Sequence, residues 1–354
     1  MVRTEQVGQW IKQTFNICYR DMKRQNCFRI LLPLVLVCVV CFCSCKKQSV
    51  SVADSIDYNK IEIPDFNADS AYCYVKNQCD FGPRTPNSQA AQKCGDYIID
   101  FMNRYADTVY VQPFSATLWD GTQVSGRNII ASFNQDATSR VLLGAHWDSR
   151  LWADQDPDVA NHKKPIIGAN DGASGVGVLM EIARIFKTKV NSQGLDIVLF
   201  DLEDHGTPDW AEEVVEDQSD WCLGSQHWSK NTHIPFYHAD YGILLDMVGY
   251  ESPRFTKEAQ SMSYASGIMN KVWEIASQQG FSDVFVSEKT YPIMDDHVWV
   301  NVYAKIPMID IVQNDLMGGF FPYWHTMEDD MRHIDKRTLK MVGDVCLTTI
   351  YSVE

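Results

Sequence analysis

The sequence lacks an excess of basic side chains. Its 354 residues include 31 Lys and Arg against 46 Asp and Glu, which gives a formal net charge of −15. A protein that binds DNA or RNA needs a basic face that neutralises phosphates. The charge balance therefore argues against nucleic acid as a partner.

Cysteine is scarce after residue 45, and no Cys-x-x-Cys pair occurs there. A zinc site built from paired thiolates is therefore disfavoured. The number of cysteines in this part is odd, so at least one has no partner within the chain. Their pairing stays open; they are Cys73, Cys79, Cys94, Cys222 and Cys346.

The sequence also lacks an apolar run of membrane-spanning length. Residues 30–43 are almost wholly apolar, but a span needs about 20 residues. Basic residues precede this run, which is typical of a signal peptide. The following Phe42-Cys43-Ser44-Cys45 resembles a bacterial lipoprotein cleavage box. We expect residues 1–45 to be a signal peptide that is removed before Cys45.

The predicted location follows from this leader. A lipid-bearing Cys45 would tether an exported protein to a membrane in the periplasm or cell envelope. An uncleaved anchor helix is the alternative. The true start also stays open between Met1 and Met22, because Met22 is followed directly by basic residues.

The remaining chain predicts one large α/β domain. Residues 46–69 are polar and mixed, as in a tether, and we expect the domain over residues 70–354. Strand-like and helical segments alternate, which predicts a mainly parallel, twisted central sheet with helices on both faces. The expected strands are 108–113, 127–133, 141–145, 196–200, 243–247, 284–286 and 307–312, and the expected helices are 71–80, 88–105, 171–186, 223–231, 261–279 and 335–351.

Short motifs with acids or histidine lie at the ends of these strands or beside turns. An open α/β sheet presents catalytic groups at such positions. Imidazole with carboxylate suits Zn²⁺, and a spare carboxylate beside the metal suits a general base. The motifs predict a zinc enzyme that acts on a carbonyl or amide; they are Gly144-Ala145-His146-Trp147-Asp148-Ser149, Gly168-Ala169-Asn170-Asp171, Phe200-Asp201-Leu202-Glu203-Asp204, Leu245-Asp246-Met247 and Trp324-His325-Thr326.

Several of these residues have a simpler interpretation. Asp171 could only cap the helix that follows it. Asp148 could orient His146 without binding metal. Asp310 lies in a β-branched run, where a buried acid needs a partner. His205 matches no pattern and is expected at the surface or in a helix.

The connection from Asp204 to Leu223 is unusually long. It contains Trp210, Trp221 and an acidic stretch between them. Long connections are often functional. A substrate-facing lid and a solvated surface insertion both stay open. Arg150, just after the first motif, could contact substrate or pair with nearby acids.

The order of the motifs resembles the zinc-dependent aminopeptidase family, which also contains the animal-type glutaminyl cyclases. The resemblance runs from about Phe81 to the C-terminus. Three segments favour the cyclase branch, in a bacterial lipoprotein version. They are Phe81-Gly82-Pro83-Arg84, Met294-Asp295-Asp296-His297 and Trp324-His325-Thr326-Met327-Glu328-Asp329.

The resemblance implies a role for each matching residue. It implies one Zn²⁺, conversion of N-terminal glutamine to pyroglutamate with release of ammonia, and substrates that are peptides and exported proteins beginning with glutamine. Asp171, Asp204 and His325 would bind the zinc, Glu203 would be the catalytic acid and base, and Asp246 and Asp295 would form a hydrogen-bonded network beside it. Trp324, Phe321 and either Trp210 or Trp221 would form the pocket wall.

The competing interpretation is a two-zinc aminopeptidase. His146, Asp171, Asp204, Asp246 and His325 could supply all its ligands. The ligand set alone does not separate the two activities; the segments around Asp295 and Trp324 favour the cyclase. A receptor-like protein without catalysis is disfavoured, because Glu203 is present with every ligand.

Overall fold

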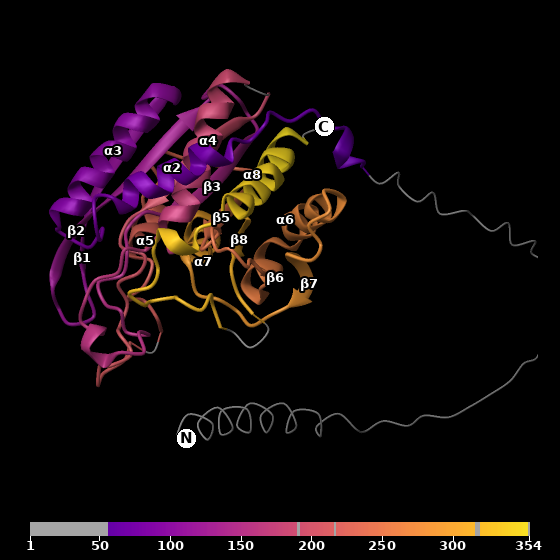
Figure 1. The fold of residues 1–354 in the computed structure, drawn as a ribbon. Coiled ribbons are helices and arrows are strands. Elements are labelled where there is room, and N and C mark those ends of the chain that lie inside the picture. Colours follow the sequence, from indigo (N-terminus) through magenta and orange to yellow (C-terminus); the bar gives the residue numbers. More distant parts are fainter. Residues whose placement is uncertain (1–55, 190–191, 216, 316–318, 353–354) are drawn as a thin grey trace, which may run out of the picture. The chain divides into compact units, whose positions relative to one another are not determined.

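The computed structural model describes residues 56–189, 192–215, 217–315 and 319–352 (Figure 1). The predicted signal peptide, its cleavage before Cys45 and residues 46–55 of the predicted tether lie outside the described residues. The rest of that tether belongs to the folded unit, which begins at Ile56. Tyr58 and Phe66 bury their rings in the core, so the boundary expected at residue 70 is too late.

A six-stranded sheet runs through the centre of this unit in the order β1-β2-β4-β3-β5-β8. Strands β4, β3, β5 and β8 are mutually parallel, whereas β1 and β2 extend the sheet antiparallel at one edge. The predicted α/β class is therefore confirmed. The strands are β1 (Thr108–Thr117), β2 (Gln123–Phe133), β3 (Arg140–His146), β4 (Gly194–Phe200), β5 (Tyr241–Asp246) and β8 (Met308–Val312).

The first strand is longer than its sequence suggests. Pro113 marks the end of the predicted strand, yet β1 continues to Thr117 and pairs Pro113 with Arg127. An edge strand tolerates proline because its outer side needs no ladder hydrogen bond. At the other extreme, every residue of β4 is buried, as expected of a strand covered on both faces.

Helices cover both faces of the sheet (Figure 1). One face carries the larger core, in which apolar residues of α2, α3, α4, α6 and α8 pack together. A smaller core on the other face packs Trp228 of α5 and Val300 against Leu142, Val198 and Leu244 of the strands. The helices are α2 (Ala68–Cys79), α3 (Gln89–Tyr105), α4 (Ala173–Thr188), α5 (Leu223–Lys230), α6 (Ala259–Gln278), α7 (Asp296–Trp299) and α8 (Lys336–Tyr351).

Short elements complete the domain. Strands β6 (Phe255–Lys257) and β7 (Phe285–Lys289) form a separate parallel pair. Single turns of helix lie at η1 (Tyr58–Lys60), η2 (Val159–Asn161) and η4 (Met331–His333), and η3 (Val300–Ala304) is a π-helical turn.

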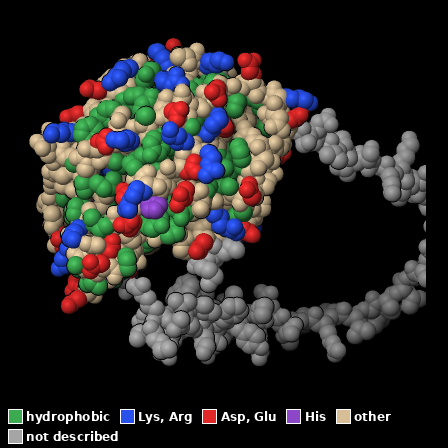
Figure 2. Space-filling model, in the orientation of Figure 1, with side chains coloured by type: hydrophobic (Ala, Val, Ile, Leu, Met, Phe, Trp, Pro, Cys, Tyr) green, Lys and Arg blue, Asp and Glu red, His purple; other side chains and the backbone are tan. Residues whose placement is uncertain are grey.

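Figure 2 shows acidic, basic and apolar side chains intermixed on one face of the molecule. Of the helices in the described residues, none has the length and apolar character needed to cross a membrane.

Candidate active site

The predicted site residues meet at the carboxyl edge of the parallel strands. His146 ends β3, Asp246 ends β5, and Glu203 and Asp204 follow β4 directly. Parallel strands present their carboxyl ends at one edge of the sheet. A cavity of about 270 Å³ opens there, and its lining includes Asp171, Glu203, Asp204, Asp246, Asp295, Trp324 and His325.

Asp171, Asp204 and His325 form a buried group suited to one metal ion. One ligand atom from each lies within 4.8 Å of the other two. The Nε2 atom of His325 is 3.0 Å from Oδ1 of Asp204 and 3.6 Å from Oδ2 of Asp171. Oδ2 of Asp204 is buried without a hydrogen bond among the described atoms, which is costly unless a cation compensates. Two carboxylates and one imidazole suit Zn²⁺ and leave a position open for substrate.

A second group shares Asp171 with the first. Nε2 of His146 lies 3.0 Å from Oδ1 of Asp171 and 3.2 Å from Oδ1 of Asp246. These three residues also meet the geometry of a metal site. Asp171 is not the cap of α4, whose N-cap residue is Gly172; its two oxygens instead face the two histidines. The geometry fits zinc, in either one or two positions.

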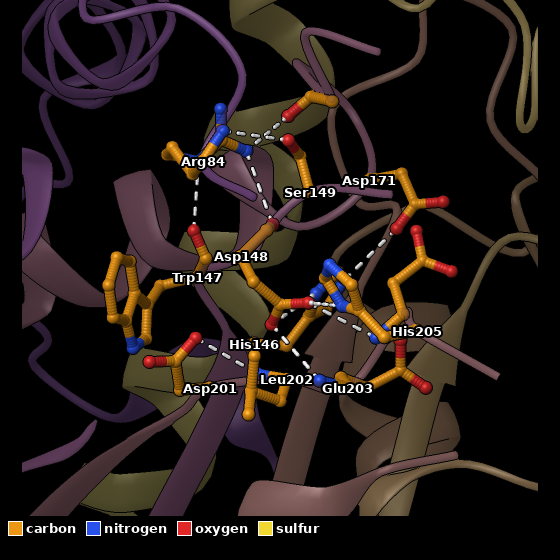
Figure 3. A network of polar contacts seen from close by, with 12 residues as sticks. Arg84, His146, Trp147, Asp148, Ser149, Asp171, Asp201, Leu202, Glu203 and His205 are labelled. Atoms are coloured by element: carbon orange, nitrogen blue, oxygen red, sulfur yellow. Dashed lines mark hydrogen bonds and ion pairs between the residues drawn. The ribbon is translucent and has the colours of Figure 1, made fainter. Parts of the chain in front are cut away.

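Asp148 joins the loops that follow β3 and β4 (Figure 3). Its carboxylate accepts the backbone N–H groups of Glu203 and Asp204, each at 3.1 Å. It also lies 3.0 Å from Nδ1 of His205 and 3.5 Å from Nδ1 of His146. Burial alone would raise the pKa of Asp148, but hydrogen bonds from the two histidines hold it well below the usual range. Asp148 thus sets the backbone positions of Glu203 and Asp204, the residues expected to be the catalytic acid and a metal ligand.

His205 is fully buried against Asp148, so its expected surface position is wrong. The residues around His205 show no periodic apolar pattern that would predict its burial. The surrounding loop lies inside the domain because Asp148 holds its backbone.

Arg84 fastens the loop after β3 to the loop that carries Asp171. Its guanidinium donates to the backbone carbonyl of Trp147 at 2.8 Å (Figure 3). It also donates to the backbone carbonyls of Ile167 at 2.6 Å and Gly168 at 2.8 Å. The side chain is fully buried. The Phe-Gly-Pro-Arg segment therefore acts on the site through backbone geometry, a role that only the three-dimensional contacts reveal.

Further buried acids orient the metal-binding side chains. Asp329 accepts the backbone N–H groups of Asn170 at 2.8 Å and Asp171 at 3.2 Å. Asp154 lies 3.4 Å from Nδ1 of His325. Such outer contacts fix ligand orientation at metal sites. Sequence reasoning missed both roles, although Asp329 belongs to a motif already singled out.

Arg150 pairs with acids, which resolves its open role. Its guanidinium donates to both carboxylate oxygens of Asp154, at 2.8 and 2.6 Å, and to the backbone carbonyl of Asp204 at 3.1 Å. The side chain is buried. Arg150 therefore links the partner of His325 to the segment that carries Asp204.

Buried acids surround Glu203 and alter its protonation. Burial raises the pKa of Glu203 well above its usual value, and the charges of Asp295 and Asp204 raise it further against the opposing effect of His146. Burial, with the charge of Asp171, raises the pKa of Asp246 to about 7 despite its hydrogen bond with His146. Groups that titrate near neutral pH suit proton transfer.

Asp310 is buried in β8, as expected, and the structure groups it with Asp295 and His297. Burial raises the pKa of Asp310 well above its usual value, and the charges of Asp295 and Asp246 add to this effect. A neutral Asp310 can donate a hydrogen bond to Asp295. His297 is buried beside these acids, and its Nε2 atom lies 3.3 Å from Oε1 of Glu258.

Two tryptophans flank His325 in the cavity wall. The rings of Trp324 and His325 stack with centroids 3.6 Å apart, and Trp221 lies parallel to His325 at 6.2 Å. Both tryptophans line the cavity. Trp210 instead packs against Trp119 and Trp152. Of the two candidates, Trp221 is therefore the one at the site.

The phenylalanine in the wall is Phe320 rather than Phe321. Phe320 lines the cavity and packs against Trp324 at a centroid distance of 4.7 Å. Phe321 is buried behind the wall against Met247 and Val312. The expectation that Phe321 lines the pocket is wrong, because Phe320 occupies the side of this segment that faces the cavity.

The long connection after Asp204 contributes to the cavity. Gln218 and Trp221 line it, whereas the acidic side chains described between them and Asp204 are exposed. Part of the connection thus faces the cavity and part is a solvated surface.

The five cysteines of the described residues are all free, so the structure pairs none of them in a disulfide.

The chain belongs to peptidase family M28, whose family model matches residues 128–350. It is therefore a member of a zinc-enzyme family, as its motifs predicted. A solved glutaminyl cyclase of Bacteroides thetaiotaomicron, bound to N-acetylhistamine, is 47% identical, with a TM-score of 0.81 over 83% of this chain and 100% of that chain. The structure of a leucine aminopeptidase precursor from Bacteroides thetaiotaomicron VPI-5482 is also 47% identical, with a TM-score of 0.80 and the same coverage.

Curated relatives are more distant. The glutaminyl-peptide cyclotransferase of Boiga irregularis is 23% identical over 249 residues, which are 62% of this chain and 63% of that protein. The chain thus spans about three fifths of the length of the first curated relatives it matches. The predicted family and fold class are confirmed, and the chain belongs to a family of zinc enzymes.

We predict that Asp148→Asn weakens the site without unfolding the domain. The amide keeps one acceptor oxygen and cannot accept both backbone N–H groups. Zinc affinity and kcat should fall about 10- to 100-fold, measured by competition with a chelator and by steady-state kinetics. The matched control is Asp136→Asn, at an exposed acid. Wild-type zinc affinity and kcat in Asp148→Asn would contradict the positioning role.

We predict a characteristic pH dependence for the metal-free protein. Because the pKa of Asp246 rises from 3.8 to about 7 on folding, the native state binds more protons than the unfolded state between these values. Stability should therefore fall as pH rises from about 4 to about 7, by at most about 4 kcal/mol. Chemical denaturation of metal-free protein across this range checks it. Asp246→Asn should flatten the decline; an equally steep profile would assign the effect elsewhere.

Proposed function

We propose that this enzyme is a glutaminyl-peptide cyclotransferase, which converts N-terminal glutamine of peptides and proteins to pyroglutamate with release of ammonia. One observation carries the proposal: Glu203, Asp295 and the indole of Trp324 line the same cavity as the zinc-binding group. The likeness to a solved glutaminyl cyclase over four fifths of the chain supports it. This cavity combines a proton-transfer group, an acidic network and a flat apolar wall.

The proposed reaction assigns a task to each group. Asp171, Asp204 and His325 would hold zinc, which supplies Lewis-acid polarisation of the substrate γ-carbonyl when bound. Glu203 takes a proton from the α-amine as that nitrogen bonds to the carbonyl carbon of the side-chain amide (Cδ), then gives a proton to the departing amide nitrogen, which leaves as ammonia. The α-amine and the side-chain amide belong to the same glutamine residue, so holding that residue in the reactive conformation supplies much of the rate.

The acids beside Glu203 set its environment. Burial, with the charges of Asp295 and Asp246, raises the pKa of Asp310, and burial, with the charges of Asp295 and Asp204, raises that of Glu203. A carboxyl group with a raised pKa accepts a proton readily and can return it, which serves both steps. The ring of Trp324, stacked on His325, gives the aliphatic part of the glutamine side chain a flat contact surface.

We infer that a single zinc ion is used. In this arrangement His146 stays outside the metal's ligands, with Asp148 at its Nδ1 and with Asp171 and Asp246 at its Nε2.

A two-zinc aminopeptidase is the second candidate. The specific observation in its favour is that Asp171 belongs to both metal-suited groups, as a bridging ligand would. Likeness to a leucine aminopeptidase precursor also supports it. In that case Glu203 would remove a proton from an attacking water molecule.

Two peptides separate the candidates. The protein is incubated with a glutamine-initiated peptide and a leucine-initiated peptide of otherwise identical sequence, and the products are identified by mass spectrometry. Loss of ammonia from the first peptide without shortening is expected. Release of free leucine from the second would favour the aminopeptidase. Zinc per chain, measured by inductively coupled plasma mass spectrometry, should be one and not two.

We predict that Glu203→Gln abolishes turnover while zinc stays bound. The amide is isosteric but cannot accept and return a proton, so kcat should fall by at least about 100-fold. Steady-state kinetics and zinc content are measured together. The control is Glu212→Gln, an exposed acid in the same connection. Activity retained by Glu203→Gln would remove the proposed mechanism.

We further propose that the enzyme acts outside the cytoplasm, anchored by lipid at Cys45, on exported proteins whose processing exposes N-terminal glutamine. The apolar run at residues 30–43 and the Ser44-Cys45 pair support this. Cys45→Ala should move the protein from the membrane fraction to the soluble fraction or leave it unprocessed, as judged by immunoblotting. An unchanged membrane fraction and mass would contradict lipidation.

A further inference from the structure

Cys222 touches the catalytic glutamate at two points. Its backbone N–H donates to the carbonyl oxygen of Glu203 at 2.9 Å. Its sulfur lies 3.2 Å from Oε1 of the same residue. Within the described part of the chain, this thiol is the only side-chain donor on the Glu203 carboxyl. The neighbouring N–H of Leu223 donates to the carbonyl of Leu202 at 3.0 Å, so the long connection ends by pairing with the catalytic segment.

The position of the thiol is itself well fixed. Cys222 is the N-cap residue of α5 and has a left-handed backbone conformation, with φ of 56°. Its carbonyl accepts the N–H of Gln226 at 3.0 Å and the hydroxyl of Ser225 at 3.1 Å. The residue is fully buried. The sulfur is therefore held by a helix start and not by a mobile loop.

The surroundings keep the sulfur protonated. Burial raises the pKa of Cys222 well above its usual value, and the acids Glu203, Asp296 and Asp295 raise it further. A thiol in such surroundings is a weak hydrogen-bond donor and an unreactive nucleophile. It can therefore donate to Glu203 without adding another negative charge to an acidic cluster.

We propose that Cys222 is a positioning residue for Glu203, and that its S–H holds one carboxyl oxygen so that the other is presented for proton transfer. The role rests on the proposed function only in the choice of substrate, because Glu203 transfers a proton in both candidate reactions. The last torsion of a glutamate side chain has a broad energy profile. A hydrogen bond to one carboxyl oxygen narrows the range of this torsion in Glu203. Proton transfer depends on such alignment of the other oxygen with the substrate.

The inference predicts a kinetic signature. Alignment of Glu203 matters in the transition state more than in substrate binding, so its loss should lower kcat and leave KM nearly unchanged. A lost weak hydrogen bond corresponds to about a fivefold to tenfold decrease in kcat. Zinc affinity should be unaffected, because Cys222 contacts none of the proposed ligands in the described structure.

Three full-length variants test the proposal. Cys222→Ala removes the donor, Cys222→Ser keeps a shorter one, and Cys346→Ala removes a buried sulfur from the core of α8. Each is measured for kcat, KM, zinc content and melting temperature, with the substrate that the wild-type enzyme turns over. Cys222→Ala should lose kcat about fivefold to tenfold, Cys222→Ser should recover part of that loss, and Cys346→Ala should lower only the melting temperature.

The outcomes are distinct. Wild-type kcat in Cys222→Ala, or equal losses in the alanine and serine variants, would overturn the positioning role. Cys222 would then have only a packing role. If Cys222→Ala does not fold, a Cys222→Ser variant with kcat above one fifth of wild type supports the donor, and one below a tenth overturns it. Release of leucine by the wild-type enzyme would instead refute the proposed function and leave the comparison of variants intact.

Discussion

Carboxyl groups crowded at one edge of a buried sheet form the constraint on which the rest of this site depends. Asp171, Glu203, Asp204, Asp246 and Asp295 all line one cavity, and each is largely removed from water. Such groups repel one another and cannot all be ionised without compensation. The structure answers this in two ways: it places histidines between pairs of acids, and it raises the pKa of the acids that remain.

These two responses divide the cavity into functional halves. On one side, His325 and the shared Asp171 leave carboxylate oxygens directed at a point that suits a zinc ion. On the other side, Asp246 and Asp310 have no metal to neutralise them in the one-ion arrangement, and burial raises the pKa of both, which favours their protonated forms. Glu203 lies between the halves. In the proposed reaction, this position lets Glu203 exchange a proton with substrate while its neighbour Asp204 binds the metal.

Residues outside the cavity make this crowding possible. Asp148 accepts two consecutive backbone N–H groups from the catalytic segment, and Asp329 does the same for the segment that carries Asp171. Arg84 ties the intervening loops together through their carbonyls. Buried backbone groups need partners, and here their partners are charged side chains. The loops that carry Asp171 and Asp204 are therefore held by hydrogen bonds between their backbones and buried charged side chains.

The sequence by itself determined the α/β class, the family and the identity of the acids and histidines, because strand periodicity and short motifs are local properties of the chain. It also placed Asp310 in a buried strand. The tertiary structure alone decided which residues meet: Trp221 and not Trp210, Phe320 and not Phe321, and a buried His205. It alone disclosed the contacts of Arg84, Asp154 and Cys222 with groups distant in sequence. These contacts depend on where loops of irregular conformation return to the sheet. A local sequence pattern does not encode which distant residues such a loop will meet.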